Sequence, residues 1–369
     1  MNKGLLLLVL VPIIVLFLSV IVNTFELSKT TDLHDFSHCR TIKTNYTFED
    51  IAVFEGHIIG GSADFISLFF KHLSAASAYP GKLVAVDIDS EKVTEVKIAN
   101  FPTSLIFNPH GIKLHEANKL YVLSHSFANG GEVVVVLQLF LSEGEISAKF
   151  LKAIKIDNNH GIYNAISIVN QDFFYISQYI PFPDTLEGRD QSFVTDLQRY
   201  VFSDFIKTNA IYLCKVTEDS ASCQSKYVGY MPNGLVISEN LLFAADVGSK
   251  TIEVFQILDN LDLVKKATVQ VNHITDNLVV SNGKVYVAGA SKIIDIVKFS
   301  NKVKADSKPY PKVSGGVSEI YQENGKWVSK EILMQDLLSF PTACAVLGQR
   351  IVLSSLSDDS LLVCPLIPS

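Results

Sequence analysis

The sequence feature that most constrains the fold is a recurring start to short apolar strands. At six places a polar side chain stands directly before an apolar run, as where Asp276 and Asn277 precede residues 278–280. The six strand starts fall at positions 50, 110, 164, 233, 277 and 343, which are 60, 54, 69, 44 and 66 residues apart. A recurrence of this length, filled with short strands, is typical of the blades of a β-propeller. The sequence therefore predicts an all-β propeller.

Strand-like runs and turn sequences alternate through the rest of the chain, as in residues 82–87 and 284–288. No amphipathic helix alternates with these runs, which disfavours a parallel α/β fold. Two stretches break the pattern. Residues 65–73 are too apolar for an ordinary loop and fall where the chain should cross a face of the propeller. Residues 184–207 carry apolar side chains at helical spacing, which predicts either a helix packed on the propeller or a lid that also touches membrane.

Oxygen-bearing side chains gather at the predicted strand starts. In a propeller the first strand of every blade lines the central axis, so polar residues at the same end of several first strands converge. Carboxylate and amide oxygens at one point indicate a site for a hard cation, and calcium above all. The alternative is that each residue is a turn residue that ends a loop. The residues concerned are Glu49, Asn164, Asn233, Asp276 and Asn277.

Two histidines are placed to act beside such a cation. His110, within residues 107–111, begins a first strand, and His125 follows the strand-like run 120–124. Adjacent antiparallel strands can bring the two imidazoles together, and such a pair can take a proton from water while a metal polarises a carbonyl. Each histidine could instead be structural. The chain has no Gly-x-Ser-x-Gly motif and no phosphate-binding loop, so serine-nucleophile and nucleotide chemistry are unsupported.

The first residues predict a membrane segment. Residues 4–22 are apolar apart from Pro12 and Ser19, and nineteen helical residues at about 1.5 Å each nearly match a bilayer core. Lys3 precedes this run and acidic residues predominate after it, which predicts a cytosolic N-terminus and a translocated body. A cleaved signal peptide, giving a secreted protein, is the alternative, but no Ala-x-Ala site follows the run. The predicted parts are an uncleaved signal-anchor (1–25), a linker (26–38) and the propeller (39–366).

A translocated body enters an oxidising compartment, where disulfides and glycans form. The sequence Asn45-Tyr46-Thr47 is then a glycosylation sequon, with the glycan expected on Asn45. The net charge of −7 argues against a nucleic-acid partner.

The five cysteines divide into two candidate pairs and one single thiol. Cys39 and Cys364 flank the whole strand-rich region, so a bridge between them would fasten the ends of a closed ring. Cys214 and Cys223 lie on two strand-like runs joined by a polar turn and can form a cross-hairpin bridge. Cys344 lies in an apolar run and is expected to be a buried thiol.

Several of these segments together resemble the paraoxonase/arylesterase family, over about residues 36–366. The segments are Phe107–Ile112, Glu49-Asp50, Pro232-Asn233-Gly234 and Asp276-Asn277. The resemblance implies a six-bladed propeller with two calcium ions in its tunnel and hydrolysis of lactones and aryl esters. It also implies a ring-closing disulfide and a catalytic dyad matching His110 and His125. The ligands of the implied catalytic calcium match Glu49, Asn164, Asn233, Asp276 and Asn277.

The chain departs from the family pattern at the second, structural calcium and in the pocket. The family's second ion is held by residues matching Asp50 and the backbone carbonyl of Ile112, and by an aspartate where this chain has Ala165. Loss of that carboxylate puts the second ion in doubt. Polar family residues are replaced at 178–180, and a histidine is replaced around 290–291. The substrate pocket is therefore expected to be altered and more apolar.

Two functions of different class follow. One is a calcium-dependent lactonase or arylesterase, in which calcium polarises the ester carbonyl and His110 activates water with help from His125. The alternative is a non-catalytic, membrane-anchored chaperone or assembly factor for membrane proteins such as ion channels. The family contains both kinds of member.

Overall fold

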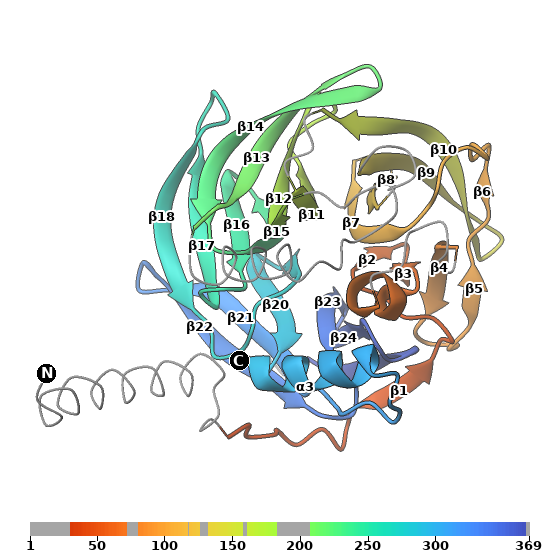
Figure 1. The fold of residues 1–369 in the computed structure, drawn as a ribbon, viewed down its shortest axis with the longest axis vertical. Helices are drawn as coiled ribbons and strands as arrows, with labels where there is room; N and C mark the ends of the chain where they lie inside the picture. The colour runs from red at the N-terminus through yellow and green to blue at the C-terminus, as the bar shows by residue number, and fades with distance from the viewer. Residues whose placement is uncertain are drawn as a thin grey trace, which may run out of the picture.

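The computed structural model describes residues 30–71, 80–116, 118–125, 132–157, 161–182 and 207–366. Its antiparallel sheets stand around a central axis, with the N-terminal strand beside the C-terminal ones (Figure 1). The predicted all-β propeller class is therefore confirmed. The predicted anchor at residues 4–22 and nearly all of the stretch 184–207 lie outside the described residues. Within the described residues, no helix is both long and apolar enough to span a bilayer.

Four of the sheets contain four strands each, and every neighbouring pair of strands in them is antiparallel. The first and second of these sheets are β2 (Ile51–Phe54), β3 (His57–Ser62), β4 (Lys82–Asp87) and β5 (Val93–Glu95), and β15 (Pro232–Ser238), β16 (Leu241–Asp246), β17 (Thr251–Ile257) and β18 (Leu263–Gln270). The third and fourth are β19 (Leu278–Ser281), β20 (Lys284–Ala290), β21 (Gly315–Glu323) and β22 (Lys326–Gln335), and β23 (Pro341–Leu347), β24 (Arg350–Ser355), β25 (Ser360–Pro365) and β1 (Arg40–Lys43).

A nine-stranded sheet contains two antiparallel runs that meet edge to edge. Strands β10 and β14 are parallel where the runs meet, with Lys155 opposite Ser220 and Ile156 opposite Ala221. A short strand, β6 (Ile98–Ala99), also pairs with β10. The two runs are β7 (Pro109–His115), β8 (Lys119–Ser124), β9 (Val133–Ser142) and β10 (Glu145–Ile156), and β11 (Gly161–Ile168), β12 (Phe173–Pro181), β13 (Asn209–Thr217) and β14 (Ser220–Gly229).

Two tight hairpins follow directly from Asn-Gly sequences. Asn282 and Gly283 have φ of 51° and 73°, and they join β19 to β20 where Ser281 pairs with Lys284. Asn324 and Gly325, with φ of 51° and 75°, join β21 to β22 in the same way. Asparagine and glycine tolerate this left-handed backbone, and the resulting turn matches the twist of the strands. These sequences therefore fix the register of both hairpins.

The innermost strand of each antiparallel run lies at one of the six strand starts predicted from the sequence. Positions 50 and 277 directly precede their strands, whereas 110, 164, 233 and 343 lie within theirs, so four of these strands begin earlier than predicted. These strands are β2, β7, β11, β15, β19 and β23. Each contacts the next in chain order, and β23 contacts β2, so they form a closed ring. Apolar side chains fill the space between adjacent sheets, as where Ile59 and Ala85 share a buried cluster with Val122 and Val135. Burial of such surface stabilises the fold by about 25 cal/mol per Å².

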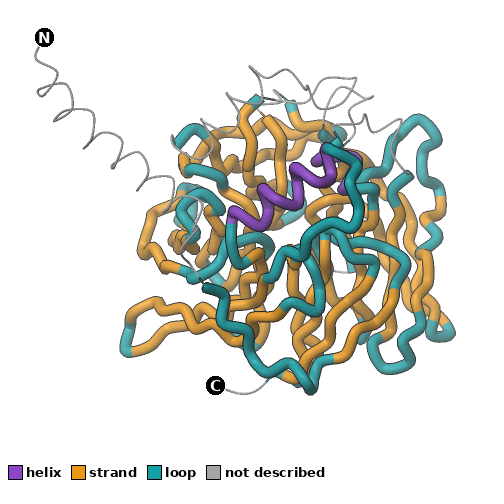
Figure 2. The backbone as a smooth tube through the Cα atoms, turned by 60° about the horizontal axis from the view of Figure 1, so that its bottom comes forward, coloured by secondary structure: helices purple, strands orange, loops and turns teal. Residues whose placement is uncertain are grey.

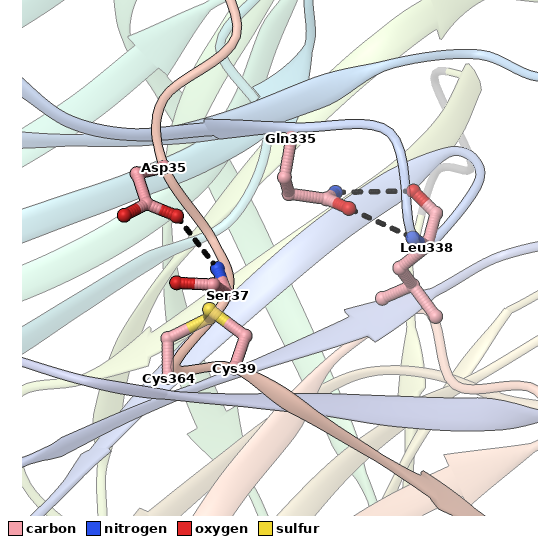
Figure 3. The surroundings of a disulfide bond; sticks show 6 residues. All are labelled: Asp35, Ser37, Cys39, Gln335, Leu338 and Cys364. Atoms are coloured by element: carbon pink, nitrogen blue, oxygen red, sulfur yellow. Dashed lines mark hydrogen bonds between the residues drawn. A yellow bond between two sulfur atoms is a disulfide. The ribbon is translucent and has the colours of Figure 1, made fainter.

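The ring is closed by the pairing of β1 with β25 and by a disulfide. Cys39, just before β1, is bonded to Cys364 in β25, and their Cα atoms lie 4.2 Å apart across a sequence separation of 325 (Figure 3). A second disulfide joins Cys214 and Cys223, which are opposite each other in β13 and β14. Both bridges agree with the sequence analysis. Cys344 is a free and buried thiol, as predicted.

Helical segments cover part of one face of the propeller. The apolar stretch after β3 forms a short π-helix, η1 (Ile66–Phe70), which contacts α3 (Ile293–Lys304). Figure 2 shows α3 running across the strands on this face. Phe65 and Phe299 belong to the apolar cluster beneath the two helices. The sequence analysis did not predict α3, although Ile293, Ile296, Phe299 and Val303 follow a helical spacing.

Candidate functional site

The five predicted oxygen ligands all lie at or just before innermost strands, so the closed ring directs them toward the axis. Glu49 precedes β2, Asn164 lies in β11, Asn233 in β15, and Asp276 and Asn277 precede β19. The Asn277 Nδ2 atom donates to Glu49 Oε1 at 2.8 Å, although the two residues are 228 positions apart. We refer to these five residues as the axial cluster.

The axial cluster contains buried oxygens that have no hydrogen-bond partner among the described residues. They are Glu49 Oε2, Asn164 Oδ1, Asn233 Oδ1 and Asp276 Oδ1. Buried polar atoms are ordinarily hydrogen-bonded, because each one left unsatisfied costs about 1–3 kcal/mol. Four such oxygens from four different strands or strand starts need a common partner. A cation that takes six to eight oxygen ligands, as calcium does, fits this set of donors.

The pKa values of the two carboxyl groups in the cluster also fit a site for a cation. Burial raises the pKa of Glu49 to about 8, although hydrogen bonds from Asn277 and Asn164 oppose the rise. Burial also raises the pKa of Asp276 well above its ordinary value, and the charges of Glu49 and Asp50 raise it further. Removal of a carboxylate from water disfavours its charged form, and an adjacent cation reverses that effect. A cation bound among these carboxyl groups would therefore favour their ionised forms.

The axial cluster offers oxygen donors to a cation rather than thiolate or imidazole donors. Across the described residues, no three His, Cys, Asp or Glu side chains are grouped so that they could hold a metal ion. Zinc sites are built from such groups, mostly thiolates and imidazoles. The axial cluster instead has three amide side chains and two carboxylates, which is the oxygen chemistry that calcium prefers.

The residues around Asp50 do not fit a second cation. Asp50 Oδ1 accepts the Ile51 N–H at 2.8 Å and Oδ2 accepts the Ile112 N–H at 2.9 Å, so both carboxylate oxygens have partners. Ala165 brings no oxygen side chain. Burial and the charge of Glu49 raise the pKa of Asp50 to about 7, and the positive charge of Lys113 opposes that rise. The sequence analysis missed Lys113, which follows Ile112 directly. Burial lowers the pKa of the Lys113 ammonium group, and the charge of Asp50 opposes that lowering.

The two predicted histidines are in direct contact. Strands β7 and β8 are antiparallel, and the Nδ1 atom of His110 is hydrogen-bonded to the Nε2 atom of His125. The other ring nitrogen of His110, Nε2, lies 3.2 Å from Glu49 Oε1 and 3.4 Å from Asn164 Nδ2. The histidine pair therefore touches the axial cluster through one nitrogen of His110.

A carboxylate that the sequence analysis missed lies behind the pair. His125 Nδ1 is 3.1 Å from Glu132 Oε1, and Glu132 Oε2 accepts the backbone N–H of Tyr163 at 3.0 Å. The only signal in the sequence was a charged residue at the head of the apolar run 133–137, which becomes strand β9. Glu132 retains only 5% of its exposure, a degree of burial that is rare for a glutamate without a partner.

Aromatic side chains border the histidine pair. The ring centroids of Phe69 and Tyr179 lie 5.2 and 6.2 Å from that of His110, and Phe65 lies 6.3 Å from it. His110 and His125 retain 2% and 1% of their exposure. One side of the pair is therefore aromatic, and both rings are shielded from water, which strengthens their hydrogen bonds.

The fold and the site define a β-propeller with an oxygen-rich axial cluster beside a histidine pair. The arylesterase family model matches residues 38–329 of the chain. The chain belongs to the arylesterase family.

Named relatives agree with this assignment. Serum paraoxonase/lactonase 3 from Homo sapiens is 25% identical over 213 residues, which are 54% of this chain and 54% of the human protein. The chain thus matches about half the length of that relative. Among solved structures, a protein assigned as a gluconolactonase has a TM-score of 0.51 at 11% identity, with 90% of this chain and 92% of that one covered. A luciferin-regenerating enzyme has a TM-score of 0.50 at 10% identity, with 89% and 95% covered. The two structures are similar to this chain in fold alone.

Proposed function

We propose that this protein is a calcium-dependent hydrolase of lactones and aryl esters. Its family and its human relative support a hydrolase of the lactonase or esterase type. The observation that carries the calcium assignment is the set of four unpartnered buried oxygens in the axial cluster. The observation that carries hydrolysis is the approach of His110 Nε2 to Glu49 and Asn164 of that cluster.

Each part of the site has a distinct task in this proposal. Glu49, Asn164, Asn233, Asp276 and Asn277 would hold the ion. A bound calcium ion would supply Lewis acidity, polarising the carbonyl and stabilising negative charge on its oxygen. His110 Nε2 would take a proton from the attacking water, and His125 would help to carry the resulting charge. Phe69 and Tyr179 would contact the apolar part of the ester.

We further infer that the propeller has six blades and holds a single cation. The six antiparallel runs each contribute one strand to the closed ring, and the nine-stranded sheet is two blades that meet along β10 and β14. The folded domain would then occupy residues 39–366. One cation is expected because Asp50 is already engaged by two backbone amides, and because Lys113 offsets its charge.

The body of the protein is proposed to lie in the secretory pathway or outside the cell. Two disulfides are typical of an oxidising compartment. Asn45 lies just after β1 and is exposed. Residues 1–25 are proposed to remain as an anchor, with 26–38 as a linker; a secreted, cleaved form is the alternative.

The non-catalytic assembly role is kept as a second candidate because of one observation. His110 and His125 are almost fully buried, so a substrate must displace covering groups to reach them. In this alternative the ion would only hold the fold together, and the partner would be a membrane protein.

Substitution of His110 separates the two functions. The protein and its His110→Gln variant should be assayed on a panel of lactones and aryl esters with calcium present. Loss of a general base typically lowers turnover by about 10²–10⁴-fold, whereas stabilisation by calcium should persist. His115→Gln is the matched control, since His115 lies at the opposite end of β7 beside Tyr121. Calcium stabilisation without turnover of any ester would favour the assembly role.

A further inference from the structure

Helix α3 and the residues that flank it carry a concentration of positive charge that the proposed site does not use. Residues 292–312 contain six lysines and two aspartates, in a protein whose net charge is −7. Figure 2 shows α3 lying across the outside of one face of the propeller. We refer to residues 292–312 as the lysine strip. Its lysines are Lys292, Lys298, Lys302, Lys304, Lys308 and Lys312.

The apolar side of α3 faces the propeller, and three lysines of the helix are exposed to solvent. Lys298 retains 61% of its side-chain exposure, and Lys302 and Lys304 are exposed as well. Lys298 and Lys302 are about one turn, or roughly 6 Å, apart along the helix axis, so their charges are neighbours on one side of α3. The apolar residues that pack into the cluster beneath the helix are Ile293, Ile296, Phe299 and Val303.

The two aspartates of the lysine strip neutralise little of its charge. Asp306 pairs with Lys71, which lies outside the strip, at 2.8 Å. Asp295 lies 3.5 Å from Lys298 on the exposed helix, and such surface pairs are weak. Lys302 and Lys304 have no hydrogen-bond or ion-pair partner among the described residues. Their ammonium groups are therefore available to an anion from outside the chain.

The lysine strip offers charge without an exposed apolar centre. The large hydrophobic side chains that are exposed among the described residues all lie outside residues 292–312. An interface with a folded protein ordinarily has an apolar centre, and a helix that enters a bilayer surface does so through apolar side chains. A linear polyanion needs neither, because it binds through neighbouring charges and through the release of its condensed counterions.

We propose that the lysine strip binds a sulfated polysaccharide. Two disulfides are typical of an oxidising compartment, and the body of the protein is proposed to lie in the secretory pathway or outside the cell. On that side of the membrane the long, densely charged polyanions are sulfated polysaccharides rather than nucleic acids. This binding is separate from the proposed hydrolysis, because it uses no residue of the axial cluster or of the histidine pair.

Binding of the full chain to heparin, in mild detergent and at about 0.15 M salt, tests the proposal. The test variant combines Lys298→Gln, Lys302→Gln and Lys304→Gln, which removes three exposed charges and leaves the buried side of α3 unchanged. Its affinity for heparin should be about 10²-fold weaker than that of the wild type, since each lysine near a polyanionic surface contributes about fivefold. The dependence of binding on salt should also become less steep, because fewer counterions are released.

A matched control removes the same charge elsewhere. It replaces three exposed lysines on the strands β13, β18 and β22 by glutamine, so that both triple variants have the same net charge. The control variant should bind heparin as the wild type does. An equal loss of affinity in the two variants would mean that heparin senses only net charge. The control positions are Lys215, Lys266 and Lys330.

A measurement on the wild-type protein keeps the test independent of how the variants fold. Brief acetylation of lysines, read by mass spectrometry with and without a heparin fragment, reports which ammonium groups the polyanion covers. Lys298, Lys302 and Lys304 should be protected, and the three control lysines should stay reactive. Absence of heparin binding by the wild type, or unchanged reactivity of the three strip lysines, would overturn the proposal. Equal protection by polyglutamate or by phosphatidylserine vesicles would also overturn it, in favour of an acidic protein or a membrane surface.

Discussion

Removal of calcium from the axial cluster should lower the melting temperature (Tm) of this protein. Four buried oxygens lose their expected partner, and two carboxylates are left in a site that disfavours their charge. An ion present at a thousand times its dissociation constant stabilises a native state by about 4 kcal/mol. For a domain of about 330 residues, the unfolding entropy is about 0.7 kcal/mol/K, so the Tm should fall by about 6 °C.

Asp276→Asn assigns this difference to the cluster. The amide keeps the shape of the side chain but removes one of the two negative charges that attract the ion. The variant should therefore bind calcium with a higher dissociation constant, and an ion that binds more weakly stabilises the native state less. The difference in Tm between calcium and chelator should shrink to about a third or less of the wild-type difference. The control is Asp246→Asn. Asp246 is also an aspartate, but it is buried and its oxygens accept the N–H groups of Tyr230 and Met231 at 2.9 and 3.1 Å.

Thermal unfolding followed by circular dichroism, with 1 mM calcium or with excess chelator, measures both shifts. Asp246→Asn should lower the Tm in both buffers and leave the calcium shift intact. Two results would refute the reasoning: a wild-type Tm that ignores calcium, or a full calcium shift in Asp276→Asn. The first would mean that the unpartnered oxygens have another partner, and the second that the ion lies elsewhere.

Three further outcomes are expected. The pKa of Glu49 is raised to about 8 and that of Asp50 to about 7, so the calcium-free folded state holds more protons than the unfolded state. Its stability should therefore fall as pH rises from about 5 to 8. Calcium needs ionised ligands, so the stabilisation by calcium should be largest near pH 8. A stability that rises with pH in chelator would contradict this. Replacement of Cys39 and Cys364 by serine should cost about 2–5 kcal/mol by chemical denaturation, and an unchanged midpoint would count against a ring-closing role. Asn45→Gln should increase gel mobility of the protein made in a secretory host, and unchanged mobility would exclude the glycan.

The ring and the histidine contact could be predicted because both depend on local patterns. A polar residue before an apolar run marks each innermost strand, and ring closure then brings these positions together whatever the loops between them do. His110 and His125 are 15 positions apart on strands that pair as neighbours, so their contact follows from a single hairpin.

Glu132 and α3 show where sequence reasoning stopped. The contact of Glu132 with the Tyr163 amide joins β9 to β11 of a neighbouring run, and no periodicity reports such a contact. The parallel pairing of β10 with β14 likewise joins strands of two different runs, which are far apart in the sequence. Helix α3 has only Phe299 and Val303 fully buried, so its apolar pattern is short and resembles that of a strand and a loop.

Calcium dependence of ester turnover tests the central claim most directly. Purified protein should be stripped with a chelator, assayed on the best lactone or aryl ester of the panel, and assayed again after calcium is restored. The expected result is loss of turnover on stripping and recovery on addition of calcium, with about one ion bound per chain at full activity. Turnover that is equally fast in chelator, or a folded, calcium-loaded protein that hydrolyses none of the panel, would contradict the account.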